Sequence, residues 1–444
     1  MTVTTQYRIV AASAAELVRA VEQAVVAGEL APGERLPSVR SLARELGLSP
    51  VTVSAALAQL RRRGIVITEQ RRGTRIGPAP PVSAARPALP VPAGARDLSR
   101  GNPDPALLPD PAAVLGRTPL PRRLYGERPV VEELELLARE QFEADGVSAR
   151  ELCVASGALD AIERVLQAHA RPGDRIAVEN PGYAALYDLL RAQGLLLEPV
   201  ELDDRGMLPA SLGHALARGV VAAVVTPRGQ NPTGAALDED RARELRAVLD
   251  GHPDVLLIED DHLGPLAGSD LHTLTAGRRR WAHTRSVAKA LGPDLRLAVL
   301  AGDTETVARV QGRQRCGPGW VSHILQTLVL ALWRDEAVAA QVARAGELYG
   351  ERRRALLDEL ALRGVAAHGA SGLNVWVPVP DESAALSALL AAGFAAAPGA
   401  WFRIRSGPGL RITTAALEAG QFERIADAVA TAARRHDDSG TGWT

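Results

Sequence analysis

The sequence predicts an α/β protein in two parts: a small N-terminal unit of three helices and a β-hairpin, and a large unit with a mainly parallel sheet covered by helices on both faces. Three observations predict this fold class. The chain has 444 residues, which is too long for one small core. Residues 78–97 are rich in proline and alanine and read as an extended linker. Beyond them, short apolar runs alternate with longer helical patterns, as in parallel α/β sheets.

Residues 1–77 carry the pattern of the small unit. Apolar side chains recur at helical spacing from Ala14, and Ser38 and Ser49 suit the N-caps of a second and a third helix. Two short strand-like runs, 65–67 and 74–76, follow the third helix. Three helices and a hairpin in this order describe a winged helix-turn-helix.

The charge of the chain is unevenly distributed. The net charge is −1, yet residues 1–77 hold only arginine and glutamate as charged residues, with arginine in excess. A basic end on an acidic body favours contact with an anion such as DNA, although chance asymmetry would give the same imbalance. The third helix would then enter the major groove.

Several classes of protein are not expected. The two cysteines, Cys153 and Cys316, form no CxxC pair, which argues against a disulfide framework or a zinc cluster and fits a reducing cytoplasm. The histidines show no HExxH spacing, so no metal site is expected. Apolar runs stay shorter than a membrane span needs, and the N-terminus lacks the order of a signal peptide. A cytoplasmic protein is predicted.

Lysine occurs once in the chain, at position 289, whereas the other basic residues are arginine. Arginine serves as well as lysine for solubility, but its guanidinium stays protonated and cannot condense with an aldehyde. The single lysine therefore points to Schiff-base chemistry, with a chance surface lysine as the alternative.

The large unit is predicted over residues 98–436, with a smaller α+β lobe at its C-terminal end. Ser156, Gly157 and Ala158 form a turn between a strand and a helix, and a helix N-terminus suits a bound phosphate. The predicted buried strands are 152–155, 176–178, 220–225, 255–258 and 297–301 in the sheet, and 373–377 and 409–413 in the lobe.

Three polar groups lie near the ends of these strands. Asn231 follows the third strand of the sheet, Asp260 ends the fourth, and Lys289 precedes the fifth. Ligand sites on parallel sheets lie beyond the carboxyl ends of the strands. Pyridoxal phosphate needs a carboxylate for its ring nitrogen, an amide or phenol for its ring hydroxyl and an amine for its aldehyde. The sequence therefore predicts pyridoxal phosphate as the cofactor.

The run GELAPGERLPSVRSLARELGLSPVTVSAALAQLRRRG resembles the N-terminal domain of GntR-type regulators. The resemblance implies a double-stranded DNA operator as partner and places Arg35, Arg40, Thr52 and Gly73 close to it. Pro50 stands where an arginine is common in that family. Position on the third helix or in the wing adds four further DNA-binding candidates, which are Ser49, Ser54, Arg71 and Arg72.

Residues 98–435 resemble the class I/II aminotransferases of fold type I. The motifs SGALDAI, ENPGY, QNPTG, EDDH, SVAK and LRLA occur in that family's order. The resemblance implies that Lys289 is the Schiff-base lysine, that Asp260 pairs with the pyridine nitrogen and that Asn231 bonds the ring hydroxyl. His262 stands where a tyrosine is usual beside that hydroxyl, and Ala288 replaces a serine.

The same resemblance assigns the remaining site residues. Tyr183 would stack on the ring, and Tyr125, in YGERP, would reach the phosphate of a neighbouring subunit. Arg411, in GLRITTA, would grip the carboxylate of a substrate or effector, with Asn374 in the same subsite. Each has a structural alternative, such as core packing for Tyr183 or an internal ion pair for Arg411. The phosphate-binding set would be Ser156, Gly157, Ala158, Ser286 and Arg296.

The two resemblances together identify the chain as similar to the MocR (GabR-like) subfamily of GntR regulators, which generally act as dimers. They imply a regulator that senses an amino compound, or pyridoxal phosphate itself, through an aldimine at Lys289. A genuine aminotransferase carrying a DNA-binding domain is the second hypothesis, and a cofactor-free dimerisation scaffold is the third. The departures at His262 and Ala288 favour a regulator with at most weak transaminase activity.

Overall fold

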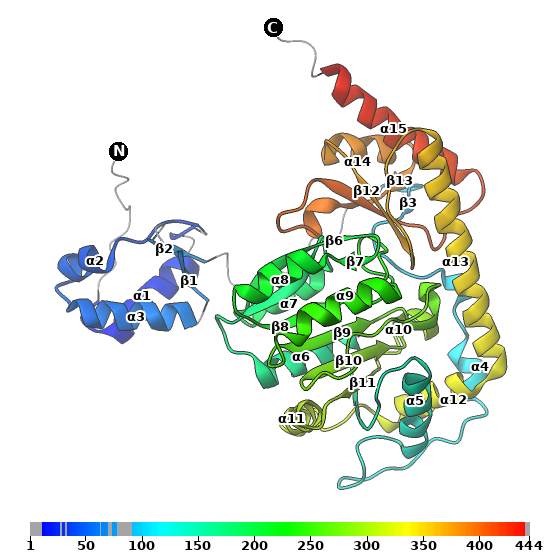
Figure 1. Ribbon diagram of the computed structural model, residues 1–444, viewed down its shortest axis with the longest axis horizontal. Coiled ribbons are helices and arrows are strands. Elements are labelled where there is room, and N and C mark those ends of the chain that lie inside the picture. Colours follow the sequence, from blue (N-terminus) through cyan, green and yellow to red (C-terminus); the bar gives the residue numbers. More distant parts are fainter. Residues whose placement is uncertain are drawn as a thin grey trace. The chain divides into compact units, whose positions relative to one another are not determined.

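The computed structural model describes residues 11–26, 29–31, 33–62, 64–69, 73–77 and 91–439. The chain divides into two compact units (Figure 1). The smaller includes the described residues up to 77, and the larger holds most of residues 91–439. Each unit has its own hydrophobic core.

The small unit has the predicted order of three helices and a hairpin. Ser38 caps the second helix by accepting a hydrogen bond from the amide of Ser41, and Gly47 ends it in the left-handed conformation. The third helix begins at Pro50, directly after Ser49. The elements are α1 (Ala14–Val26), α2 (Val39–Leu46), α3 (Pro50–Arg62), β1 (Val66–Glu69) and β2 (Gly73–Ile76).

One apolar cluster holds the small unit together. Leu17 of α1 and Val53 and Leu60 of α3 are fully buried, and Leu42 of α2 joins them. The antiparallel β1–β2 hairpin closes the cluster with Ile76. Three helices followed by an antiparallel hairpin around one core confirm the winged helix-turn-helix fold.

The large unit is built on an eight-stranded sheet in the order β4-β11-β10-β9-β8-β5-β6-β7. Strands β8, β9 and β10 run parallel, whereas β11 runs antiparallel to both of its neighbours. The strands are β4 (Glu151–Ala155), β5 (Arg175–Asn180), β6 (Leu196–Asp203), β7 (Gly206–Met207), β8 (Val220–Val225), β9 (Leu256–Asp261), β10 (Trp281–Ser286) and β11 (Ala298–Gly302).

Strand β10 was missing from the sequence-based prediction, and it carries the connection to Lys289. Its sequence, WAHTRS, has four polar residues among six, yet all six residues are buried. Only a short segment with the single-turn helix α10 (Ala288–Leu291) joins β10 to β11. A connection this short lets the chain turn back as an antiparallel neighbour, which explains why β11 is reversed in an otherwise mainly parallel core.

Helices pack around this sheet (Figure 1). Helices α6 and α11 pack on one another and against β4 and β11, and α8 and α9 pack on one another beside β8. The helices are α5 (Glu132–Ala144), α6 (Ala158–His169), α7 (Ala184–Ala192), α8 (Pro209–Ala217), α9 (Glu239–Asp250), α11 (Thr304–Arg315) and α12 (His323–Arg334). The short α4 (Pro111–Leu115) contacts α12.

The long helix α13 (Glu336–Leu362) leads from the large sheet to the C-terminal lobe (Figure 1). The lobe contains β12 (Asn374–Pro378), β14 (Ala397–Pro398) and β15 (Gly409–Thr413), with α14 (Glu382–Ala391) and α15 (Gln421–Ser439) packed together. Its strand β13 (Phe394–Ala395) pairs in parallel with β3 (Arg96–Asp97). Thus β3 lies just before the predicted start of the large domain, and the predicted end at 436 falls within α15.

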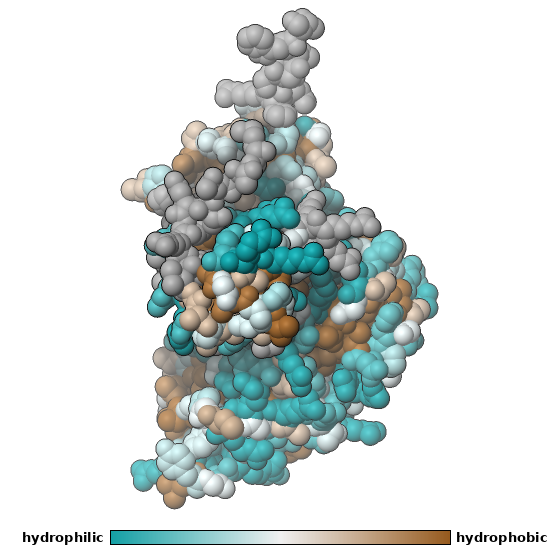
Figure 2. Space-filling model, turned by 90° about the vertical axis from the view of Figure 1, so that its left-hand side faces the viewer, coloured by the Kyte–Doolittle hydropathy of each residue, from teal (hydrophilic) through white to brown (hydrophobic). Residues whose placement is uncertain are grey.

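Hydrophilic and hydrophobic side chains alternate in patches on the face shown in Figure 2. Among the described residues, no helix is long and apolar enough to cross a membrane.

Candidate functional site

A cavity of about 220 Å³ opens where β8, β9 and β10 end, and it brings together most of the predicted cofactor residues. The lining also includes Arg100, Gly101 and Thr226, which were not among the predicted site residues. The predicted residues that line it are Ala158, Tyr183, Asn231, Asp260, His262, Ser286, Lys289, Arg296, Asn374 and Arg411.

Lys289 enters the cavity from the single turn of α10. Its ammonium donates a hydrogen bond to the main-chain carbonyl of Gly101. Burial and the nearby Arg411 guanidinium lower the pKa of Lys289 to about 8. Because the neutral amine is the nucleophile toward an aldehyde, this shift prepares Lys289 for imine formation near neutral pH.

Asp260 lies at the carboxyl end of β9 with its side chain buried. Its Oδ1 atom has no hydrogen-bond partner within the described chain. Burial, together with the charges of Asp261 and Glu179, raises the pKa of Asp260 to about 7. A buried carboxylate oxygen without a partner is costly, and a protonated ring nitrogen would supply both the proton and the positive charge that it lacks.

Arg411 of β15 is buried, and in this structure its guanidinium is engaged by the protein itself. Nη1 donates to Oδ1 of Asn231 at 3.0 Å, and Nη2 donates to the carbonyl of Ser99. The guanidinium lies 4.8 Å from the ring centre of Phe402. Burial lowers the pKa of Arg411 to about 10, which leaves it charged at neutral pH. Asn231 and Arg411, predicted for separate subsites, therefore contact one another.

The turn that precedes α6 is shaped around Arg296. Gly157 has a φ of +102°, and a Cβ atom there would lie 2.7 Å from Nη2 of Arg296. The same Nη2 atom approaches the carbonyl of Ser156 at 3.4 Å. A side chain at 157 would push Arg296 away from the N-terminus of α6, so glycine keeps a cation and free main-chain amides together. Ser156 and Gly157 border the cavity without lining it.

The other lining residues are placed by local contacts. Ser286 Oγ accepts from the amide of Ala288 at 3.2 Å, which orders the start of α10. Asn374 accepts a hydrogen bond from Thr413 at 3.0 Å. Burial and the charge of Lys289 lower the pKa of His262 to about 4. The imidazole is therefore neutral at pH 7 and can donate one hydrogen bond where a tyrosine would do so.

Tyr125 lies apart from the cavity. Its side chain is 91% exposed and meets the ring of Trp320 edge-on at 5.5 Å. The exposed ring is available to another molecule, which is the position that the predicted contact with a neighbouring subunit requires.

The sequence reasoning missed Glu179 and the segment that contains Ser99 and Gly101. Glu179 accepts hydrogen bonds from Thr226 and Gln230, and burial raises its pKa to about 7. Glu179 is the first residue of the ENPGY motif, so the motif that predicted Tyr183 also contained it. Ser99 and Gly101 contact the site through main-chain carbonyls, so the identity of their side chains does not predict their role.

The described DNA-binding candidates lie on α2, α3 and the wing. Ser49 Oγ accepts from the amide of Thr52 at 3.0 Å and lies 2.8 Å from its hydroxyl, so both hydroxyls take part in capping α3. Ser54 and Arg40 are exposed on their helices. The side chain of Arg35 lies beside Gly73 of the wing. Arg71 and Arg72 lie outside the described residues.

The residues of the cavity fit pyridoxal phosphate. The chain's single lysine, with a lowered pKa, faces the same cavity as an unpartnered buried carboxylate oxygen of Asp260. Arg296 and the N-terminus of α6 offer positive charge on the same cavity. These are the three groups that the aldehyde, ring nitrogen and phosphate of the cofactor need.

Comparison with known proteins gives two family matches. The aminotransferase class I and II family matches residues 121–429, and the gntR family of bacterial regulatory proteins matches residues 13–76. The chain is 38% identical over 421 residues to the vitamin B6 salvage pathway transcriptional repressor PtsJ of Salmonella typhimurium, covering 93% of this chain and 97% of that protein. It is 30% identical to the HTH-type pyridoxine biosynthesis transcriptional regulator PdxR of Corynebacterium glutamicum, covering 78% of each.

Solved structures support the fold of the large unit. The kynurenine aminotransferase of Pyrococcus horikoshii superimposes with a TM-score of 0.69 over 78% of this chain and 92% of that one, at 20% identity. The α-aminoadipate aminotransferase LysN of Thermus thermophilus gives a TM-score of 0.67 at 22% identity, over 77% of this chain and 93% of that one. At this identity the likeness establishes the fold alone. Taken with the family matches, it shows that the chain belongs to the MocR type of GntR-family regulators, in which a winged helix-turn-helix is fused to a pyridoxal-phosphate-dependent domain of the class I and II aminotransferase fold.

Proposed function

We propose that this protein is a transcriptional regulator that works in the cytoplasm and changes its affinity for a DNA operator when pyridoxal phosphate, or an amino compound that reacts with it, occupies the cavity at Lys289. The observation that carries the proposal is the juxtaposition of the chain's single, half-buried lysine with the unpartnered oxygen of Asp260, in a chain that also holds a DNA-binding fold. The ligand must have different affinities for the conformations that bind the operator well and poorly.

When bound, pyridoxal phosphate supplies an aldehyde that condenses with a primary amine. Lys289 would offer that amine, and the buried carboxylate of Asp260 would accept a hydrogen bond from the protonated ring nitrogen. The amide of Asn231 and the neutral imidazole of His262 are the proposed donors toward the ring hydroxyl. Tyr183 is the proposed stacking partner of the ring.

The phosphate is proposed to bind at the N-terminus of α6. Main-chain amides at Gly157 and Ala158 point away from the helix and Arg296 adds a full positive charge, so a dianion would be held by both. Ser286, at the end of β10, is the proposed hydroxyl ligand. The close approach of Gly157 to Arg296 supports this subsite.

Pyridoxal phosphate itself is the effector that the cavity favours. The cavity is small, at about 220 Å³, and Arg411 already bonds Asn231 and Ser99. An amino acid would have to displace these partners before its carboxylate reached Arg411, with Asn374 beside it. The names of two relatives, a vitamin B6 salvage repressor and a pyridoxine biosynthesis regulator, agree with control of vitamin B6 supply.

A homodimer is the proposed working form, with Tyr125 reaching the phosphate subsite of the second subunit. Its exposed ring, supported on one edge by Trp320, favours this arrangement.

A genuine aminotransferase is the second candidate, because Lys289, Asp260 and Arg411 are all present in the cavity. A transaminase would release a keto acid steadily, whereas a regulator would respond to the ligand with little or no turnover. The two are separated by measuring keto acid from a panel of amino acids over many turnovers.

The proposed function is tested by selecting genomic DNA fragments that the purified full-length protein retains, and then measuring their affinity by fluorescence anisotropy with and without pyridoxal phosphate. We expect the affinity to change with the cofactor in the wild-type protein and to stay constant in Lys289→Ala. A matched control is Arg334→Ala, an exposed cation on α12 outside the cavity. A Lys289→Ala protein that keeps the full response would contradict the proposal.

A further inference from the structure

A second cavity, of about 430 Å³, lies against the same short helix that carries Lys289. The two cavities share Ser286, but the second contacts Ala290 and Leu291 of α10 in place of Lys289. Its other walls come from the end of α5, the loop after β8, the end of α12 and the start of α13. The proposed function leaves this cavity unused.

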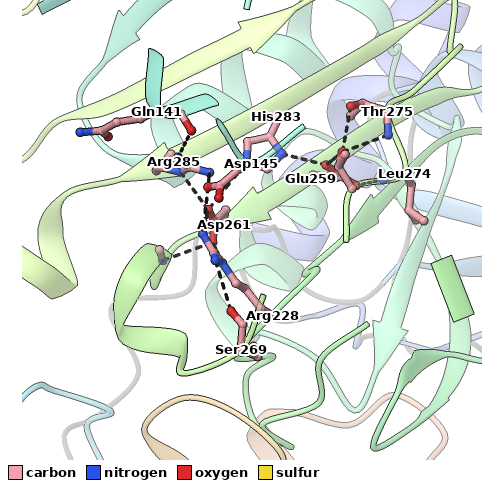
Figure 3. A network of polar contacts seen from close by, with 12 residues as sticks. Gln141, Asp145, Arg228, Glu259, Asp261, Ser269, Leu274, Thr275, His283 and Arg285 are labelled. Atoms are coloured by element: carbon pink, nitrogen blue, oxygen red, sulfur yellow. Dashed lines mark hydrogen bonds and ion pairs between the residues drawn. The ribbon is translucent and has the colours of Figure 1, made fainter. Parts of the chain in front are cut away.

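The polar end of the second cavity is a cluster of buried charges (Figure 3). Asp261 accepts from Nε and Nη2 of Arg228 at 2.8 and 2.9 Å, and from Nε of Arg285 at 2.9 Å. These three side chains are each no more than 8% exposed. Asp145, which follows α5, completes the cluster by accepting from Nη2 of Arg285 at 2.5 Å.

Asp145 differs from the rest of the cluster in its exposure. Its side chain is 32% exposed, and its carboxylate lies 3.6 Å from Nη2 of Arg228. Without it, the two guanidiniums and Asp261 carry one uncompensated positive charge. The neighbouring buried His283 pairs with Glu259 at 2.7 Å, and its Nε2 atom also lies 3.8 Å from Asp261, so it adds no negative charge to the cluster. Asp145 is therefore the partly exposed carboxylate of a cluster whose other three side chains carry a net positive charge.

The rest of the cavity is apolar. Leu291 of α10, Leu332 and Trp333 of α12, and Val338 and Val342 of α13 form its walls. Apolar walls with a few convergent charged groups are typical of small-molecule sites of this size.

We propose that this second cavity binds a small organic carboxylate with an apolar or aromatic body. The carboxylate takes the place of Asp145 on Arg285, so one anion replaces another and the buried charge stays balanced. The apolar body lies between Trp333 and the α13 valines. The bound molecule contacts α10 at Ala290 and Leu291, whereas the cofactor cavity contacts the same helix at Ala288 and Lys289. Binding of the carboxylate does not depend on the proposed function. Only the effect of that binding on Lys289 rests on the proposed function.

Phenylacetate is a suitable probe, with phenylacetamide as its uncharged counterpart. Binding to the full-length protein, saturated with pyridoxal phosphate, is measured by calorimetry and by ligand-observed NMR. We expect phenylacetate to bind at least tenfold more tightly than phenylacetamide. Asp145→Asn removes the competing anion, so it should tighten phenylacetate binding several-fold. Equal affinity for the acid and the amide, or weaker binding to Asp145→Asn, overturns the proposal.

A steric variant locates the probe. Ala339 of α13 lines the mouth of the cavity and is exposed, so Ala339→Phe should fill the mouth without disturbing the core. We expect this variant to lose phenylacetate binding. The neighbouring Ala340 is exposed and outside the lining, so Ala340→Phe should keep it. Retained binding in Ala339→Phe overturns the proposal, as does a change of oligomeric state in that variant, which would assign the cavity to a second copy of the chain.

Two variants separate this site from the cofactor cavity. Arg411→Gln removes a buried guanidinium that lines the cofactor cavity, and Lys289→Ala abolishes imine formation. Both should bind phenylacetate as the wild type does, even if the proposed function fails. Loss of binding in Arg411→Gln would assign the probe to the cofactor cavity and overturn the inference. In the wild type, phenylacetate should also shift the pH at which the visible absorbance of the bound cofactor changes.

Discussion

Burial moves the two central ionisable groups of the cofactor cavity toward their neutral forms. The pKa of Lys289 falls to about 8, and that of Asp260 rises to about 7. Both shifts bring the groups near neutral pH, where a small change of environment alters their protonation. Cofactor binding would supply such a change, because a protonated ring nitrogen beside Asp260 favours its carboxylate form.

Asp260→Asn tests the carboxylate at the residue scale. The amide keeps the shape but loses the charge-assisted hydrogen bond, which contributes about 1.5–3 kcal/mol. We expect the dissociation constant for pyridoxal phosphate to rise by roughly tenfold to a hundredfold, measured by absorbance titration. Asp270→Asn, at an exposed position outside the cavity, is the control and should bind as the wild type does.

The rate of cofactor binding should depend on pH through Lys289. The lowered pKa leaves roughly one lysine in ten neutral at pH 7, so the rate should rise through about pH 8 and then level off. Arg411→Gln removes the nearby positive charge, so the midpoint should move to higher pH. Arg411→Lys keeps the charge and should leave the midpoint close to 8. Stopped-flow absorbance measures both, and an unchanged midpoint in Arg411→Gln would disprove this electrostatic coupling.

Site residues could be predicted from the sequence where the chemistry requires one particular type of side chain. Lys289, Asp260 and Asn231 were placed from amine, carboxylate and amide chemistry at strand ends, and the structure gathers them in one cavity. The contact of Asn231 with Arg411 was not foreseen, because the two are far apart in the chain. Their roles toward a ligand stay predictions.

At the scale of elements, the caps and glycines marked the helices of the small unit well. Ser38 caps α2 as predicted, and Gly47 ends it, since the preferences of both residues are local. Strand β10 was not predicted because its polar side chains are buried against partners on another strand. His283 pairs with Glu259, and Arg285 pairs with Asp261. A polar strand whose partners lie on the next strand has no alternation to reveal it.

Helix α2 offers a test of the DNA-binding surface. Arg40 is exposed and is predicted to contact a phosphate. Arg40→Gln should weaken binding to specific and random DNA alike, and should reduce the slope of log affinity against log salt by about 0.9. Arg19→Gln, on the exposed side of α1, is the matched control and should leave the slope unchanged. A loss confined to one DNA sequence would indicate base contact instead.

At the scale of the whole molecule, the proposed dimer predicts complementation. Light scattering should give twice the 46.9 kDa of one chain. Tyr125→Ala and Lys289→Ala should each impair both sites of their own homodimers. A mixed dimer of the two variants regains one intact site, with Lys289 from one chain and Tyr125 from the other. A random equal mixture makes half of the dimers mixed, so cofactor absorbance should recover toward about a quarter of the wild-type value on mixing and refolding; no recovery would place Tyr125 outside the partner's site.

The fold class of the molecule could be predicted from the sequence, but the order of the strands in the sheet could not. Apolar runs identified β4, β5, β8, β9 and β11, yet their sequence order differs from their order in the sheet. Strand order depends on which connections cross over, and a single sequence gives no measure of that. The domain limits at 77 and 98 stay predictions, as does the dimer.

The main-chain carbonyls of Ser99 and Gly101 affect how strongly a ligand can bind in the cofactor cavity. They accept hydrogen bonds from Arg411 and Lys289, so main chain already occupies one donor of each cation. A ligand that takes the place of either carbonyl gains only the difference between two hydrogen bonds. This stretch begins two residues after β3, so a ligand that replaced either carbonyl would release main chain next to that strand.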